Sequence, residues 1–372
     1  MSEELLLHGA TLDAEALQRF LGHVFGANAS ALANGEAATP VCIWGTHGIG
    51  KTMLVEKYTV KNGWKLAYCA PAQFEEMGDL HGLPVIQERE DGTTETEFAP
   101  PSWVPREAGP GILLLDDLNR ADDRILRGFM QLLQRGELAS WGLPEGWQIV
   151  ATANPEGGDY SVTPMDDAML TRMLHVSMEF DAKAWARWAV DAGVDPRGIN
   201  FVLTYPEAVT GRKTTPRSLC QFFAQIANIP DLRTQFDLVH NLGMSALDDV
   251  TVQIFASFVN DNMTLLLDPE EILDQFSPGE TNEKMKALAW DDETLRVDRL
   301  ATVCTRLYLH LVHPSYKPQD RHREPLVNFT IFEDLPNDLR LTFHRDLIAE
   351  APETVVRWLR DPRLASLALA GL

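Results

Sequence analysis

The sequence predicts an α/β protein in which a parallel sheet carries helices on both faces and is followed by a mostly helical region. Two observations lead to this prediction: short apolar runs alternate with amphipathic stretches over residues 41–180, and mainly helix-like stretches follow residue 181. Such alternation is typical of a parallel sheet built from strand–helix–strand units. At 372 residues the chain is also longer than one ordinary hydrophobic core supports. We therefore expect two or three domains.

Five apolar runs are expected to be buried strands of this sheet. They are VCIW (41–44), WKLAYC (64–69), GILLLDD (111–117), WQIVATAN (147–154) and LHVSMEF (174–180). Helix-like segments follow Gly50, Asp122 and Pro164. Between the second and third runs, residues 83–100 hold two β-rich stretches around an Asp-Gly pair. This pattern predicts a hairpin inserted into the α/β domain.

The N-terminal residues are expected to be helical. Residues 11–32 open on Thr and Asp capping candidates and carry apolar residues at helical spacing. We therefore predict an N-terminal helical segment at residues 1–36, ahead of the α/β domain at residues 37–180.

The C-terminal half is expected to be two helical regions. Helix-like stretches lie at residues 182–193, 217–229, 249–267, 297–312 and 352–361. Loops rich in Pro, Gly and Asp interrupt them at residues 268–281 and 314–325. We place the first helical region at residues 181–276 and the second at residues 277–372.

Composition narrows the class of protein. Apolar residues make up 45% and charged residues 23% of the chain, which are ordinary values for a globular protein. The formal net charge of -22 is spread along the chain, and nucleic-acid affinity depends largely on Lys and Arg side chains that neutralise phosphates. DNA or RNA is therefore disfavoured as the main substrate, although assembled subunits can still form a local basic channel.

The spacing of the cysteines and the hydropathy of the chain indicate in which cellular compartment the protein is expected. Cys42, Cys69, Cys220 and Cys304 lie far apart without a Cys-x-x-Cys pair, which favours reduced, buried thiols over disulfides or a zinc ribbon. No apolar stretch has the length of a membrane span, and the N-terminus lacks the pattern of a signal peptide. We expect a cytoplasmic protein without a membrane partner.

The stretch GTHGIGKT follows the first predicted strand and precedes a predicted helix. Its spacing, Gly-x-x-x-x-Gly-Lys-Thr, is that of a phosphate-binding loop, in which backbone N–H groups face the phosphates. Lys51 supplies positive charge to the β and γ phosphates, and the Thr52 hydroxyl can reach Mg²⁺. A helix that begins near Gly50 adds its partial positive charge. The predicted nucleotide-binding residues are Gly45, Thr46, His47, Gly48, Ile49, Gly50, Lys51, Thr52 and Met53.

Two further motifs supply polar groups at the ends of later strands. Asp116 ends the run GILLLD, where a parallel sheet binds ligands, and is our candidate Mg²⁺ residue beside Thr52. Asp117 is placed to polarise an attacking water. The alternative is that this Asp pair only caps the next helix, a role that Asp122 and Asp123 fill better.

Asn154 follows the run WQIVATA and precedes Pro155. Its amide can orient water or contact the γ phosphate from the tip of a strand. An Asn-Pro pair alone is more often only a turn signal. Its place after the two phosphate motifs favours the functional interpretation.

With these three motifs in order, the chain resembles AAA+ ATPases, in particular the MoxR type of the helix-2-insert clade. DDLNRA resembles the second phosphate motif of that family, ATANP its sensor-1 strand, MDDAMLTRMLHV the segment with its arginine finger, and TTPRSL its sensor-2 motif. The hairpin at residues 83–100 lies where this clade carries its insert. The resemblance covers residues 37–229, and more loosely the helices up to residue 276. It implies an AAA+ P-loop NTPase domain at residues 37–180 and a helical lid at residues 181–276.

The resemblance also implies a role for individual residues. It assigns Lys51 and Thr52 to phosphate and Mg²⁺, Asp116 to Mg²⁺, Asn154 to sensor 1, Arg172 to the arginine finger and Arg217 to sensor 2. A finger that a neighbouring subunit donates stabilises charge in the transition state, so activity would require a ring. Either arginine can instead be an ordinary surface or ion-pair residue.

Asp117 departs from the family pattern, which usually has Glu at this position. The Asp carboxylate reaches about 1.5 Å less far, one C–C bond. Because a misplaced water-positioning group lowers the rate, we predict slow basal hydrolysis.

Two other groups of residues admit a functional and a plain interpretation. The first group, Phe74, Met77 and Leu80, follows the second strand and would grip a substrate if these side chains faced a pore. The favoured alternative is that they are core residues of a short helix. The hairpin is another element that can reach a partner.

The second group has spacings compatible with metal ligation and consists of His310, His313, Cys304 and His322. The favoured alternative is a packed helix followed by a solvated loop.

The resemblance leads to a hypothesis about function. It implies an Mg²⁺-dependent ATPase that acts as a homo-oligomeric ring, usually of six subunits, and remodels a protein substrate as a chaperone. MoxR ATPases also imply a partner with a von Willebrand factor type A domain. The alternatives are a nucleotide-gated scaffold or switch with little hydrolysis, which Asp117 keeps open, and a GTP-dependent nucleic-acid motor, which the acidic charge disfavours.

Overall fold

The computed structural model describes residues 7–89, 91–157, 161–210, 212–260, 267–276 and 280–365 of the chain. They form two compact units, which are described separately. The first unit comprises Met1–Ala184 with Thr215–Arg217, and the second comprises Trp185–Thr214 with Ser218–Leu372. In the described part of the chain, no helix has the length and apolar character needed to cross a membrane.

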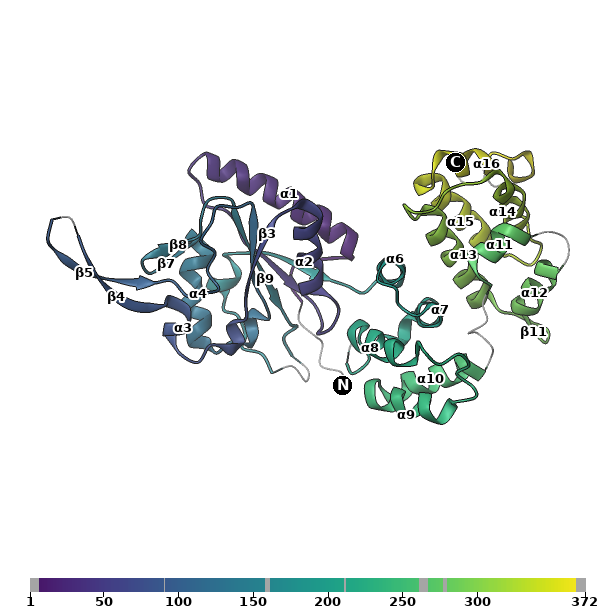
Figure 1. The fold of residues 1–372 in the computed structure, drawn as a ribbon, viewed down its shortest axis with the longest axis horizontal. Coiled ribbons are helices and arrows are strands. Elements are labelled where there is room, and N and C mark those ends of the chain that lie inside the picture. Colours follow the sequence, from purple (N-terminus) through teal and green to yellow (C-terminus); the bar gives the residue numbers. More distant parts are fainter. Residues whose placement is uncertain are drawn as a thin grey trace. The chain divides into compact units, whose positions relative to one another are not determined.

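A parallel sheet forms the centre of the first unit (Figure 1). It has six strands in the order β1-β10-β2-β9-β6-β3. The strands are β1 (Ala10–Leu12), β2 (Val41–Trp44), β3 (Lys65–Cys69), β6 (Gly111–Leu115), β9 (Trp147–Ala153) and β10 (Leu174–Met178). The five predicted strands are therefore present. Strands β2, β6 and β9 are buried along their whole length, as their uninterrupted apolar runs predict.

Two details of the sheet differ from the predictions. Strand β3 is not fully buried: it lies at the edge of the sheet, and Lys65, Leu66 and Tyr68 are exposed. Residues 10–12 form strand β1, paired with β10, where a helix was predicted to begin at residue 11. Helix α1 (Ala14–Ala33) begins after Asp13, whose carboxylate accepts the Ala16 N–H at 2.7 Å. The N-terminal residues thus join the sheet as well as forming a helix.

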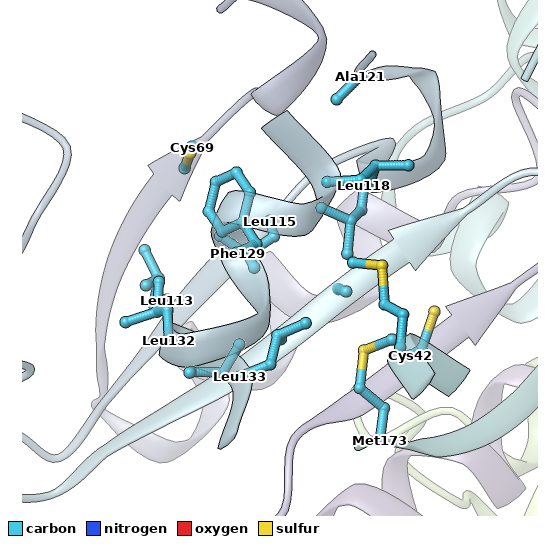
Figure 2. Packing of buried hydrophobic residues seen from close by; sticks show 14 of the residues in the cluster. Cys42, Cys69, Leu113, Leu115, Leu118, Ala121, Phe129, Leu132, Leu133 and Met173 are labelled. Carbon is cyan, nitrogen blue, oxygen red and sulfur yellow. The ribbon is translucent and has the colours of Figure 1, made fainter. Parts of the chain in front are cut away.

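Helices cover both faces of the sheet, as predicted. On one face, α1 and α2 (Lys51–Asn62) pack against alternate strand residues such as Val41 and Ile43. On the other face, α3 (Met77–His81) and α4 (Asp123–Arg135) pack against Cys42, Leu113 and their neighbours. Figure 2 shows residues from this second cluster. Side chains alternate between the two faces because successive strand residues point in opposite directions.

Strands β4 (Leu83–Glu88) and β5 (Thr94–Ala99) form an antiparallel hairpin at the predicted insert, and it extends away from the sheet (Figure 1). Leu83 and Ile86 on it are exposed. A second small hairpin, β7 (Glu137–Leu138) with β8 (Trp141–Gly142), contacts its base: the Phe98 N–H donates to Ser140 Oγ.

The structure favours the core interpretation of the residues after β3. Leu80 is fully buried, and Phe74 and Met77 pack against the cluster on this face of the sheet. A Cβ atom on Gly128 of α4 would lie 2.4 Å from Leu80 Cδ2, so α3 and α4 can approach this closely only because residue 128 is glycine.

The second unit is helical. Its helices are α6 (Ala182–Asp191), α7 (Pro196–Thr204), α8 (Pro216–Ile226), α9 (Phe236–Ala246), α10 (Asp249–Asn260), α11 (Pro269–Gln275), α12 (Glu280–Ala289), α13 (Val297–Val312), α14 (Arg323–Thr330), α15 (Asn337–Glu350) and α16 (Glu353–Trp358), with a short hairpin of β11 (Trp290–Asp291) and β12 (Thr294–Leu295). The first residues of α6 and α8 group with the first unit. The predicted continuation of α10 over residues 261–266 lies outside the described residues.

Candidate nucleotide-binding site

The phosphate loop connects β2 to α2. Gly50 is the N-cap of α2 and has a φ of 108°, a left-handed conformation that glycine adopts without strain. Gly48 has a φ of 70°, and a Cβ atom there would lie 2.6 Å from Thr215 Oγ1. The loop therefore needs glycine at these positions for two separate reasons, backbone conformation and close packing.

Lys51, the first residue of α2, points back into the loop. Its Nζ donates to Gly45 O at 2.7 Å, to Thr46 O at 3.2 Å and to Asn154 Oδ1 at 3.2 Å. Only 5% of the residue is exposed. Burial lowers the pKa of Lys51 to about 8, against the opposing effect of Asp117 and Asp116. A buried ammonium group with neutral acceptors is incompletely compensated, which suits a site for an anion.

Thr52 and Asp116 lie together, as the sequence predicts for a metal site. The Thr52 hydroxyl donates to Asp116 Oδ1 at 2.7 Å. Thr152 on β9 donates to the same oxygen at 2.8 Å, and the Tyr68 hydroxyl donates to Asp116 Oδ2 at 3.0 Å. Hydroxyl and carboxylate oxygens are hard donors of the kind that Mg²⁺ prefers beside substrate phosphates. The donor set therefore fits Mg²⁺ together with a nucleotide.

Asp117 does not cap helix α4. The N-cap of α4 is Asp122, whose carboxylate accepts the Ile125 N–H at 2.9 Å. Asp117 has a φ of 50°, and its Oδ1 accepts from Asn154 Nδ2 at 2.9 Å. Its Oδ2 lies 3.3 Å from Arg120 Nε. The predicted water-positioning carboxylate thus faces the loop lysine across Asn154.

Asn154 lies directly after β9 and is fully buried. Its amide connects two charged groups, because its Oδ1 accepts from Lys51 and its Nδ2 donates to Asp117. Asn119 holds the backbone of Asn154: its Nδ2 donates to Asn154 O at 2.8 Å, and its Oδ1 accepts the Asn154 N–H at 3.0 Å. The three predicted motifs therefore converge at the carboxyl ends of β2, β6 and β9.

The two predicted arginines are placed differently. Arg172 follows the four-residue helix α5 (Asp167–Leu170) and donates from Nη1 to Ala168 O. Its Nε is buried and has no hydrogen-bond partner among the described residues. Arg217 donates its backbone N–H to Gly48 O at 3.2 Å, and its side chain is exposed. The backbone of Arg217, the second residue of α8, therefore contacts the phosphate loop.

Other predicted loop residues line the site less closely. Met53 is 43% exposed, whereas Thr46, His47 and Ile49 are half-buried. Four residues at the site were not predicted: Tyr68, Asn119, Arg120 and Thr152. Asn119 and Arg120 belong to the DDLNRA motif, so their proximity was available from the sequence, but their contacts were not.

The histidines near α13 make protein contacts. His313 Nε2 lies 2.7 Å from Asp191 Oδ1, and His322 Nδ1 lies 2.9 Å from the Tyr316 hydroxyl. His310 packs edge-on against Tyr316. Within the ranges that the structure describes, no three His, Cys, Asp or Glu side chains are grouped to hold a metal ion.

Comparison with known proteins is consistent with this geometry. Residues 40–173 match the family model described as AAA domain (dynein-related subfamily). A search of curated protein sequences gave no match.

Several solved structures are similar to this chain. RuvB, the Holliday junction branch migration motor of Thermotoga maritima, is 14% identical over 68% of this chain and 79% of that chain, with a TM-score of 0.38. One variant of RuvB is 13% identical over 69% of this chain and 79% of that chain, with a TM-score of 0.41. Another variant is 14% identical over 94% of this chain and 90% of that chain, with a TM-score of 0.37.

These overall similarities support no inference about activity. The family match covers strands β2, β3, β6 and β9 of the sheet, the phosphate loop, Asp116, Asn154 and Arg172. Residues 40–173 therefore match an AAA domain of the dynein-related subfamily, and the first unit has the AAA+ P-loop NTPase fold.

Proposed function

We propose that the protein is an Mg²⁺-dependent ATPase whose activity requires a ring of identical subunits. The observation that carries the proposal is the convergence of Lys51, Thr52, Asp116 and Asn154 at the carboxyl ends of three neighbouring strands. Separate motifs meet there around a buried positive charge and a pair of oxygen ligands. An AAA domain generally binds ATP with Mg²⁺, and this arrangement supports the same for this chain.

Each residue at the site has a proposed role. The residues from Gly45 to Met53 surround the phosphates, and Lys51 neutralises them. Thr52 and Asp116 hold Mg²⁺, which when bound supplies positive charge that offsets the charge developing on the phosphate oxygens. Asp117 orients the attacking water, with Asn154 as sensor 1. Arg217 contacts the nucleotide of its own subunit, and Arg172 reaches the site of a neighbouring subunit.

Slow turnover is part of the proposal. Asp117 already interacts with Asn154 and Arg120, and its short side chain limits its reach. Both features favour slow hydrolysis. They equally favour the second candidate function, a nucleotide-gated scaffold that binds ATP, assembles and hydrolyses very little.

The partners follow from the resemblance to MoxR ATPases. We propose a cytoplasmic hexamer that remodels a protein substrate together with a von Willebrand factor type A domain protein. Leu83 and Ile86 are exposed apolar residues of the hairpin, one on each face of it, and both can contact a protein partner. A nucleic-acid motor, with GTP or ATP, is disfavoured by the formal net charge of -22.

The test is ATP turnover per subunit as a function of protein concentration, for the wild type and for Arg172→Ala. In a ring, wild-type turnover rises with concentration because each site is completed by a neighbour, whereas Arg172→Ala binds ATP but stays inactive. Arg135→Ala is the matched control, since Arg135 lies on α4 and forms an exposed ion pair with Glu137, in which Arg135 Nη1 is 3.5 Å from Glu137 Oε1. It should behave as the wild type.

Other outcomes separate the candidates. If Arg172→Ala and the wild type turn over ATP equally slowly at all concentrations, Arg172 is not a finger and the scaffold is the better account. If neither protein binds ATP, the proposed function is wrong.

A further inference from the structure

Tyr68 contacts the candidate metal carboxylate from outside every motif described above. It lies on the edge strand β3, opposite Leu114 of β6 in the register of the sheet. The ladder continues past β6, since the Asp116 N–H donates to Cys69 O at 2.8 Å. This register brings the Tyr68 hydroxyl to 3.0 Å from Asp116 Oδ2.

Packing does not explain a tyrosine at this position. The side chain is 50% exposed, and Tyr68 is not a member of either apolar cluster of the first unit. Its neighbour Cys69 is buried and does contribute to the core. The hydrogen bond to Asp116 is therefore the distinctive interaction of this side chain.

The Asp116 carboxylate receives three hydroxyl donors. Thr52 and Thr152 both donate to Oδ1, which uses the two lone pairs of that oxygen. Tyr68 donates to Oδ2 and leaves one lone pair of that oxygen free. Because the last torsion of an Asp side chain is soft, donors on both oxygens are needed to fix the plane of the carboxylate. Tyr68 supplies the donor on the second oxygen.

We propose that Tyr68 is a positioning residue for the divalent-cation site, which orients the Asp116 carboxylate and thereby sets the affinity for Mg²⁺. The inference rests on the proposed function, because it assumes that Asp116 and Thr52 hold the metal beside a nucleotide. Residues that orient metal-binding carboxylates through hydrogen bonds generally raise metal affinity. Tyr68 acts on the metal through Asp116 and makes no contact with the reaction itself.

The test uses Tyr68→Phe, which removes only the hydroxyl group, in the full chain. Binding of a fluorescent ATP analogue is measured in EDTA and during a titration with Mg²⁺. We expect the Mg²⁺ concentration at half-maximal effect to rise by about tenfold. Affinity in EDTA should be unchanged, because the phosphate loop is intact.

Tyr58→Phe is the matched control. Tyr58 lies on α2 in the same unit, and its ring packs against Phe25 and Trp64. Loss of its hydroxyl should leave the Mg²⁺ titration unchanged. Thermal unfolding of each variant without nucleotide shows that the fold is retained.

The outcomes distinguish this inference from the proposed function. If the wild type needs Mg²⁺ for tight binding and Tyr68→Phe needs no more of it, Tyr68 has no positioning role and the inference alone fails. The same holds if Tyr68→Phe loses affinity equally with and without Mg²⁺. If wild-type binding does not respond to Mg²⁺ at all, the metal part of the proposed function fails together with the inference.

Discussion

The two units use polar side chains in different ways. In the first unit, polar contacts at the site join segments far apart in the chain, such as Thr152 with Asp116 and Asn119 with Asn154. In the second unit, several Arg–Asp pairs join residues only two positions apart: Asp195 with Arg197, Arg296 with Asp298, and Asp361 with Arg363. Long-range contacts position groups from several strands, whereas these local pairs secure the ends of helices.

The charges also differ in how well they are compensated. Hydrogen bonds from Arg363 lower the pKa of Asp361 to about 2, so its local partner stabilises the charged carboxylate. Burial lowers the pKa of Lys51 to about 8, so its surroundings destabilise the charged ammonium group. A satisfied charge stabilises the fold, whereas an unsatisfied one is available for a ligand. We therefore expect substitution of such a charge to lower nucleotide affinity in the first unit and thermal stability in the second.

The largest expected effect is that of Lys51→Met on nucleotide binding. Loss of the charged donor should lower ATP affinity by about 100-fold. Thermal stability without nucleotide should not fall, because the variant no longer buries a poorly compensated charge. Fluorescence titration with nucleotide and thermal unfolding give the two quantities.

Lys57→Met is the control, since Lys57 is an exposed residue on the same helix. It should bind ATP as the wild type does. Equal loss of affinity in both variants would mean that the total charge, and not the buried position of Lys51, determines binding.

Arg197→Met should have the opposite effect. Arg197 pairs with Asp195, and it donates to Ile229 O at 2.7 Å and to Ile226 O at 2.9 Å, at the end of α8. Breaking this partly buried network should cost about 2 kcal/mol of stability. The thermal midpoint of the second unit should then fall by about 5 °C, while ATP affinity stays unchanged.

Arg345→Met is the control for this measurement, because Arg345 is exposed and, within the part of the chain that the structure describes, forms its ion pair with its neighbour Asp346. It should leave the midpoint within about 1 °C of the wild type. If Arg197→Met is as stable as the wild type, the local pairs contribute little to stability, and the two units do not differ in how their charges are compensated.

The difference between local and long-range contacts also explains which features could be predicted from the sequence. Each phosphate motif is a continuous segment that follows an uninterrupted apolar run, so Lys51, Asp116 and Asn154 could be placed at strand ends. The insert hairpin was equally local, because Asp91-Gly92 marks its turn. These features needed no knowledge of which strands are neighbours.

The contacts of Thr152 and Tyr68 depended on the register of the sheet. Leu115 pairs with Ala151, which puts Thr152 next to Asp116, and Tyr68 pairs with Leu114. A shift of one residue would turn both side chains to the opposite face, and nothing in the sequence determines that choice directly. Strand β1 was missed for another reason: its three residues run directly into the capping residue of α1.

The smallest expected effect concerns Asp117, where the long-range network meets the chemistry. Its φ of 50° is a conformation that Asp and Asn tolerate better than longer side chains do. Asp117→Glu should therefore cost about 1 kcal/mol of stability. It should nevertheless raise ATP turnover by about tenfold, because the carboxylate gains reach toward the water. The measurement is the turnover number at saturating ATP and protein concentration.

Asp117→Asn provides the control, because it keeps the backbone preference and the size of the side chain but removes the charge. It should bind ATP and lose turnover. If Asp117→Glu is no faster than the wild type while Asp117→Asn is inactive, the carboxylate acts at its present length and its reach does not limit the rate. If neither substitution changes turnover, the bonds to Asn154 and Arg120 serve only to hold Asp117 in place. The site of the first unit would then resemble the local pairs of the second, and the nucleotide-gated scaffold would be the better account.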